Sequence, residues 1–184
     1  MRSQLFALLL VPFILTAQIG TQPAGAQNSP HPSQPDTQMQ ETPEDMKANM
    51  EEGIKHLLVS QVEAWNHGKL DGFMQGYWQS PELTFFSGDT VTKGWEPTLM
   101  RYRQRYQAEG KEMGKLEFQD LNIDLLSRRS AVVTGRWQLT MSGGKTSDGK
   151  TPGGKQPHGL FTLILKRLPP EGWKIVHDHT SAAE

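Results

Sequence analysis

The sequence predicts an α+β fold in which helices cover one face of a strongly curved antiparallel sheet. The three stretches with helical periodicity all lie before residue 107, whereas residues 115–181 show the alternation of apolar and polar side chains that is typical of β-strands. Helices early and strands late favour the α+β class. The alternation changes parity at Gln119-Asp120, which indicates a β-bulge that bends the sheet. A bent sheet closed by a long helix forms a cone with an interior.

The first predicted helix is long, with apolar residues at helical spacing from Met46 to Trp65. Its start is marked by residues 42–45, Thr-Pro-Glu-Asp, where a capping hydroxyl precedes a proline and two acids. Gly68 follows its end and can adopt the left-handed cap conformation.

Two shorter helices follow the long one. The first fits residues 70–77, and the second begins after Gly94. The second has a predicted buried stripe made of Trp95, Leu99, Tyr102 and Tyr106, whereas Arg101, Arg103 and Arg105 are expected to point elsewhere.

The predicted strands begin with a short hairpin at residues 83–86 and 90–92. Long antiparallel strands follow, among them residues 131–141, where the alternation is regular. Residues 160–168 are apolar on both parities, which predicts a central strand buried on both faces. Residues 173–181 form the last predicted strand.

A phosphate-loop pattern falls in the glycine-rich loop predicted for residues 142–157. Residues 144–151 match G-x-x-x-x-G-K-[ST], but phosphate binding needs a helix that starts at the Lys-Thr pair. Residues 152–157, Pro-Gly-Gly-Lys-Gln-Pro, cannot form that helix. We therefore predict a hairpin loop without a nucleotide site.

The composition excludes several classes of function. The 184 residues contain no cysteine, which excludes disulfides, thiolate metal sites and cysteine nucleophiles. The 19 Lys and Arg residues are balanced by 20 Asp and Glu residues. A net charge near zero gives no electrostatic basis for binding nucleic acid or an anionic membrane.

The N-terminal segment predicts export. Residues 1–26 have a positive start, an apolar run from Leu5 to Leu15 and the small residues Ala24-Gly25-Ala26 at a cleavage site, as a signal peptide has. The apolar run is shorter than the ~20 residues of a membrane-spanning helix. Residues 27–45 are rich in Pro and Gln and predict a disordered tether, so the folded domain comprises residues 46–184. The mature protein is expected in the periplasm or secreted into the medium.

Several short motifs follow one another along the chain: Ala64-Trp65-Asn66-x-Gly68-x-Leu70-Asp71, Tyr77-Trp78, Phe86-Ser87-Gly88, Gly94-Trp95 and residues 172–181. They occur in the same order in one superfamily. The chain resembles the nuclear transport factor 2-like superfamily, in its SnoaL-like branch of bacterial domains of unknown function, and its closing His-x-His-x-Ser is also similar to the association domain of calcium/calmodulin-dependent protein kinase II. The resemblance implies a cone-shaped α+β domain, usually a homodimer, with a pocket between helices and sheet.

Aromatic residues are concentrated between positions 77 and 106, where seven of them occur. Tyr and Trp suit a pocket wall because each offers an apolar body and one hydrogen-bond donor. On the polar parity of its strand, Arg136 is a candidate anchor for a carboxylate at the mouth of the cone. The candidate ligand-binding residues are Tyr77, Trp78, Trp95, Tyr102 and Arg136.

His177 and His179 lie two apart on the last predicted strand, so their imidazoles share one face. They are the candidate catalytic acid–base groups because a histidine pKa lies near working pH, and His179 is also a candidate pocket wall. Asp178 points the other way. Two histidines fall short of the three or four ligands that zinc needs, and we predict no metal or cofactor.

The function expected from these observations is that of an exported domain that binds a small apolar or aromatic molecule. Two alternatives stay open: an isomerase, hydrolase or dehydratase with a histidine base, and a dimeric association module without a ligand. The steroid-isomerase branch places an aspartate where this chain has Phe86-Ser87. The epoxide-hydrolase branch needs an Asp-Arg-Asp set, for which Asp124, Arg136 and Asp178 supply the types but no assured geometry.

Overall fold

The computed structural model describes residues 41–108, 112–141 and 156–183. The predicted signal peptide, the tether up to residue 40 and most of the loop at residues 142–157 lie outside these ranges. Within them no helix is both long and apolar enough to cross a membrane. The elements in chain order are α1 (Pro43–Asn66), α2 (Leu70–Met74), β1 (Thr84–Ser87), β2 (Thr90–Lys93), α3 (Trp95–Tyr106), β3 (Lys115–Ser127), β4 (Ser130–Thr140), β5 (His158–Leu168) and β6 (Gly172–Thr180).

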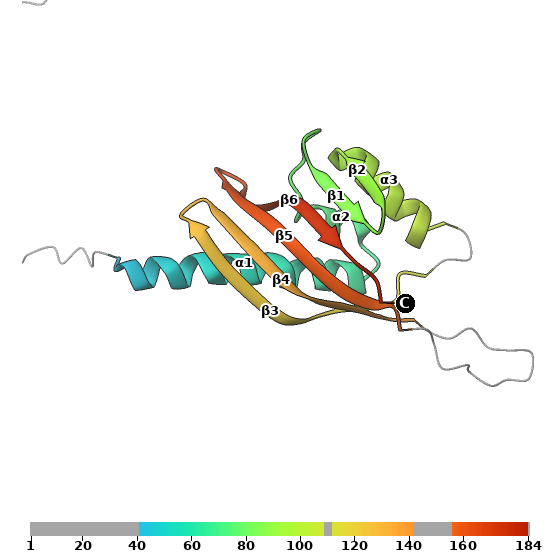
Figure 1. The fold of residues 1–184 in the computed structure, drawn as a ribbon, viewed down its shortest axis with the longest axis horizontal. Helices are drawn as coiled ribbons and strands as arrows, with labels where there is room; N and C mark the ends of the chain where they lie inside the picture. Colours follow the sequence, from blue (N-terminus) through green and yellow to red (C-terminus); the bar gives the residue numbers. More distant parts are fainter. Residues whose placement is uncertain (1–40, 109–111, 142–155, 184) are drawn as a thin grey trace, which may run out of the picture. The chain divides into compact units, whose positions relative to one another are not determined.

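The strands form one curved, unclosed sheet with the order β2-β1-β6-β5-β4-β3. α1 runs along one face of this sheet, and α2 and α3 lie near its β1–β2 end (Figure 1). The expected α+β architecture is therefore confirmed. The sheet is not antiparallel throughout, because β1 pairs with β6 in parallel. β1 and β6 are far apart in sequence, so the intervening chain supplies the long crossover that a parallel pair requires.

α1 begins where its capping residues predict. The Asp45 N–H donates to Thr42 Oγ1 at 3.1 Å, and the Thr42 N–H donates to Asp45 Oδ2 at 3.2 Å. This reciprocal pair is a capping box, which satisfies two otherwise unpaired donors of the chain at the helix start. Because α1 starts at Pro43, residues 43–45 belong to the helix and not to the predicted tether.

The register of the sheet shifts at three places, and the sequence predicted one of them. Between β3 and β4 the register shifts between Gln119 and Asn122, and Asp120 has a φ of 52° there. A second shift between β3 and β4 lies between Leu125 and Ser127. The third lies between β5 and β6: Ile164 pairs with His177 while Leu165 pairs with Ile175. Val176 is therefore an extra residue in β6 that reverses the orientation of the side chains after it.

The core lies between the helices and the inner face of the sheet, where α1 contributes Ile54 and Leu58. β5 is central in the sheet, as predicted, but only one of its faces is buried. On the other face Leu160 is 52% exposed and Ile164 37% exposed, because none of the described helices and strands covers that face.

Candidate functional site

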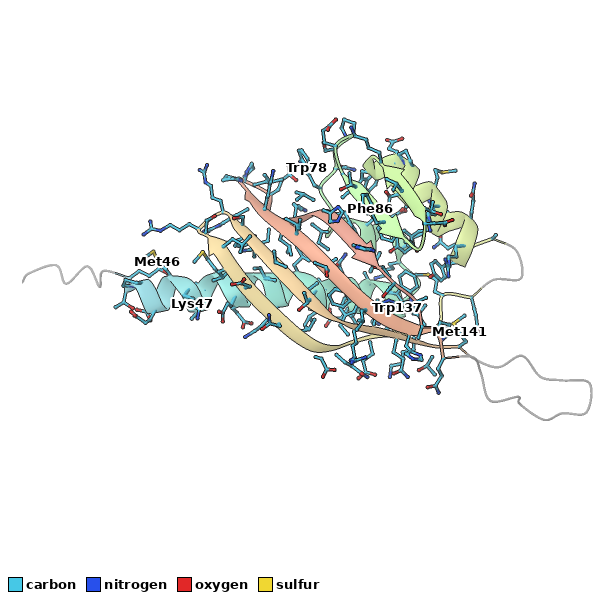
Figure 2. The ribbon with its side chains drawn as sticks, viewed as in Figure 1. Met46, Lys47, Trp78, Phe86, Trp137 and Met141 are labelled. Atoms are coloured by element: carbon cyan, nitrogen blue, oxygen red, sulfur yellow. The ribbon has the colours of Figure 1, made fainter. Side chains whose placement is uncertain are left out.

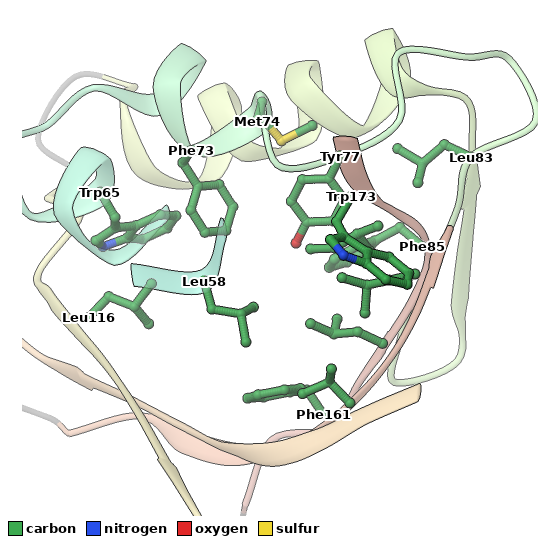
Figure 3. Close-up of a cluster of buried hydrophobic side chains, with 14 of the residues drawn as sticks. Leu58, Trp65, Phe73, Met74, Tyr77, Leu83, Phe85, Leu116, Phe161 and Trp173 are labelled. Atoms are coloured by element: carbon green, nitrogen blue, oxygen red, sulfur yellow. The ribbon is translucent and has the colours of Figure 1, made fainter. Parts of the chain in front are cut away.

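A cavity of about 350 Å³ lies between the helices and the inner face of the sheet. Figure 3 shows Trp65, Phe73 and Tyr77 on the helical side of this interior and Phe161 on the sheet side. The most exposed residues of its lining, which mark the mouth, are Gly88, Arg105 and Ala182. Nine aromatic side chains contribute to the lining: Trp65, Phe73, Tyr77, Phe85, Tyr102, Tyr106, Phe118, Trp137 and Phe161.

Asp178 is the only acidic residue in this lining, and its side chain is almost completely buried. Tyr77 Oη donates a 2.7 Å hydrogen bond to Asp178 Oδ2, and Thr180 Oγ1 donates a 2.7 Å hydrogen bond to Oδ1. Among the described residues no basic group lies within ion-pair distance of this carboxyl.

Burial raises the pKa of Asp178 to about 6, although the hydrogen bonds from Thr180 and Tyr77 oppose the shift. The carboxyl therefore changes its protonation state near neutral pH. A group with such a pKa can accept and return a proton, which is the requirement for general acid–base catalysis.

Two tyrosines add hydroxyl groups to the interior. Burial, with the nearby Asp178 charge, raises the pKa of Tyr77 and of Tyr102 well above 10. Both phenols therefore remain neutral hydrogen-bond donors. Tyr102 packs against the rings of Trp65, Phe73 and Phe85, with ring centroids 5.4 to 6.0 Å apart, and this packing fixes its position.

Two arginines of α3 also line the cavity, which corrects the expectation that they point elsewhere. Arg101 Nη1 donates to Thr92 Oγ1 at 3.1 Å, and its guanidinium carbon lies 5.5 Å from the centre of the Phe85 ring. The guanidinium carbon of Arg105 lies 5.5 Å from the centre of the Tyr106 ring. Because the two arginines are four residues apart, one helical turn places them on the same side of α3.

Of the predicted ligand-binding residues, Tyr77 and Tyr102 line the cavity, whereas Trp78, Trp95 and Arg136 do not. Trp78 lies far from the cavity-lining Trp137 (Figure 2). Trp95 instead donates its indole N–H to Met74 O at 3.0 Å, which joins α3 to α2.

Arg136 lies on the outer face of the sheet, where its Nε is 3.0 Å from Asp120 Oδ2. The alternation of β4 was therefore predicted correctly, but its polar side faces away from the cavity. Asp124 is likewise exposed and outside the lining, so no Asp-Arg-Asp set forms with Asp178.

The two candidate catalytic histidines are also on the outer face. His177 Nδ1 lies 2.6 Å from Thr84 Oγ1, and the Phe86 ring packs against both imidazoles with centroids 4.9 and 5.9 Å apart. Burial and the proximity of His179 lower the pKa of His177. The extra residue Val176 is the reason for this placement, because it turns Asp178 inward and both histidines outward.

Metal ligation has no support in the described residues. They contain no group of three or more histidine and acidic side chains arranged to hold a metal ion. The polar groups of the cavity that were not among the predicted site residues are Gln61, Ser87, Arg101, Arg105, Asp178 and Thr180.

This architecture defines the class of the protein, which is a cone-shaped α+β domain with an internal cavity. Comparison with known proteins finds the same fold in solved structures. An NTF-2-like protein of unknown function from Shewanella oneidensis MR-1 is 36% identical and aligns over 71% of this chain and 97% of its own, with a TM-score of 0.59. A nuclear transport factor 2 (NTF2-like) superfamily protein from Salmonella enterica is 17% identical over 75% of this chain and 94% of its own, with a TM-score of 0.60. A ketosteroid isomerase-like protein from Erwinia carotovora is 13% identical over 71% of this chain and 94% of its own, with a TM-score of 0.54.

The sequence profile of the SnoaL-like domain matches residues 54–184. The chain belongs to the SnoaL-like domain family, within the NTF2-like fold. No match was found among curated proteins.

Proposed function

We propose that this chain is an exported protein that binds a small, largely apolar molecule in its aromatic cavity. The observation that carries this proposal is the carboxyl of Asp178, buried and hydrogen-bonded within a cavity whose other walls are mostly aromatic. Burying a carboxyl raises the free energy of the folded state. A polar group kept in such a place, with a pKa near neutral, is a functional-site candidate on physical grounds.

The size and lining of the cavity fit this proposal. A volume of about 350 Å³ is at the small end of the range of ligand pockets, which runs from about 300 to 1,000 Å³. Such pockets combine apolar walls with a few polar groups that orient the ligand. Here Asp178, Tyr77 and Thr180 are polar groups joined in one hydrogen-bonded set.

Native mass spectrometry of the protein purified from the envelope of its own host tests the proposal. Removal of residues 1–26 predicts a chain that begins at Gln27, and a bound molecule adds its mass to the folded protein. The matched control is Ser87→Trp. Ser87 is a half-buried residue of the cavity lining next to Gly88 at the mouth, so an indole at this position fills part of the cavity and should release the adduct. An unprocessed chain contradicts export, and a clean apoprotein in both samples contradicts ligand binding.

A catalytic role is the second candidate function, and the pKa of Asp178 favours it. In this proposal Asp178 replaces the histidines as the acid–base group, because His177 and His179 lie on the other face of the sheet. Tyr77 stabilises the carboxylate after the proton has left and keeps Oδ2 in position.

Proton transfer by Asp178 predicts exchange between the bound molecule and solvent. The molecule released from the native protein should gain deuterium or be converted in heavy water when wild-type protein is added. With Asp178→Asn the rate should fall at least about 100-fold, the usual contribution of general acid–base catalysis. His179→Ala, the control, should leave the rate within about twofold. Equal rates for wild type and Asp178→Asn would leave binding as the function.

We also propose that the chain forms a homodimer through the outer face of its sheet. Leu160 and Ile164 are exposed on this face of the central strand β5. Phe86 of β1 packs against the two histidines of β6 on the same face. Apolar side chains exposed together on a sheet favour association. Analytical ultracentrifugation should therefore give a dimer at micromolar concentration.

Leu160→Glu should convert this dimer to a monomer, because it places a charge in the proposed interface. Val59→Glu is the matched control: Val59 is 54% exposed on α1, and its substitution should leave the dimer intact. A wild-type monomer at this concentration would overturn the proposed interface.

A further inference from the structure

Arg101 and Arg105 bring two positive charges to the cavity. Four ion pairs are found among the described residues, and neither arginine takes part in one. Arg103, which lies between them on α3, does: its Nη2 is 2.9 Å from Asp71 Oδ1, away from the cavity. On α3, Arg103 is therefore paired with a carboxylate at the surface, whereas the two cavity arginines have no ion-pair partner among the described residues.

Contacts with the cavity wall orient both guanidinium groups. Arg101 is held by Thr92 and lies over the Phe85 ring, while Arg105 lies over the Tyr106 ring. A guanidinium that stacks on an aromatic ring keeps its edge N–H donors available for an anion. Because Arg105 is exposed at the mouth and Asp178 is buried, the cationic and acidic groups lie at different depths.

We propose that Arg101 and Arg105 form an anion-binding rim, so that the ligand of this cavity carries an oxyanion on an apolar body. Carboxylates, sulfonates and phosphates share the chemistry that a guanidinium recognises. The anion binds at the rim, the apolar body packs against the aromatic walls, and the far end reaches toward Asp178. The inference rests on the proposed binding function and adds to it the class of the ligand.

Two fluorescent dyes of the same skeleton test this rim. 8-Anilinonaphthalene-1-sulfonate carries an oxyanion, and N-phenyl-1-naphthylamine lacks it. Fluorescence titration of the wild-type protein should give a Kd for the sulfonate dye at least about tenfold lower than that for the neutral dye, since charge-assisted hydrogen bonds differ from neutral contacts by this much.

The arginine variants should remove this preference. Arg101→Gln and Arg105→Gln should each raise the Kd of the sulfonate dye about fivefold to tenfold, while the Kd of the neutral dye stays within about twofold. Arg105→Lys, which keeps the charge without the planar fork, should have a smaller effect than Arg105→Gln. Arg103→Gln removes the same charge from the same helix outside the cavity and should change neither Kd.

Ser87→Trp shows whether the dyes bind in the cavity, since it should abolish binding of both. Dye binding that survives Ser87→Trp, an equal effect of Arg103→Gln, an equal loss of both dyes in the arginine variants, or no binding of either dye would each overturn the anion-binding rim. The experiment measures equilibrium binding and needs no turnover. Asp178→Asn should retain the preference for the sulfonate dye, so failure of the proposed catalysis is separate from failure of the rim.

Discussion

At pH 8, replacing Asp178 by asparagine is expected to raise the free energy of unfolding by about 3 kcal/mol. Burial raises the pKa of this carboxyl from 3.8 to about 6, and each pKa unit corresponds to about 1.4 kcal/mol. At pH 8 the folded protein must therefore hold a buried charge at a cost that the unfolded chain does not have. Asparagine has nearly the same shape and can bond to the hydroxyls of Tyr77 and Thr180 without a charge.

The sign of the pH dependence follows from proton linkage. Between pH 4 and pH 6 the folded protein keeps the Asp178 proton while the unfolded chain has lost it. Because the folded state binds more protons in this window, the stability of the wild-type protein falls there as the pH rises. The difference between Asp178→Asn and wild type should therefore be small at pH 4, grow up to about pH 6 and stay constant above it.

Urea denaturation of both proteins across this pH range measures the difference directly. Asp124→Asn is the matched control, because Asp124 is exposed on β3 and outside the cavity. Its stability relative to wild type should not change with pH in this way. If the free energies of unfolding of wild type and Asp178→Asn changed with pH in parallel, burial would not hold the carboxyl in its protonated form.

Trp65→Ala should lower the free energy of unfolding by about 4 kcal/mol, within the range for removal of a buried tryptophan. Trp65 is 3% exposed, and its ring centroid lies 5.0 Å from that of Phe73 and 4.8 Å from that of Tyr106. Its indole N–H also donates to the carbonyls of Met113 and Gly114 at 3.1 and 3.2 Å, which ties α1 to the start of β3.

Trp65→Phe separates these two contributions, because it keeps an aromatic ring but removes the donor. It should lower the stability by about 1 to 2 kcal/mol, the usual effect of a lost hydrogen bond to a buried group. Chemical denaturation of the two variants gives the comparison. Equal losses would mean that the hydrogen bonds, and not the aromatic packing, account for the role of Trp65.

The elements of this fold could be predicted from local sequence because local rules decide them. Thr42 and Asp45 form a capping box within four residues, and the stripe from Met46 to Trp65 has the period of a helix. The bulge at Gln119-Asp120 was visible because apolar residues change sides there. The pairing of β1 with β6 was not predictable in this way, since it joins segments that are far apart in the chain.

The cavity could be predicted only in part. Tyr77 and Tyr102 were expected to face an interior, and the structure places both in the lining. Trp78 and Trp95 have the same chemistry but different surroundings, and aromatic type alone does not distinguish a cavity wall from a packing residue. The direction of Arg101 and Arg105 depends on Thr92, Phe85 and Tyr106, which only the folded chain brings near them.

By itself the sequence determined the order of helices and strands, the start of the long helix, and the opposite directions of Asp178 and its two neighbouring histidines. Only the tertiary structure decided which of those directions leads into the cavity. Val176 follows the apolar Ile175 and precedes the polar run from His177 to Thr180, and a pair of adjacent apolar residues does not by itself identify the extra residue between β5 and β6. That single residue reverses the orientation of β6 beyond it, because side chains alternate with a period of two. The acid–base candidate of this protein is therefore Asp178, and the histidines belong to the outer face.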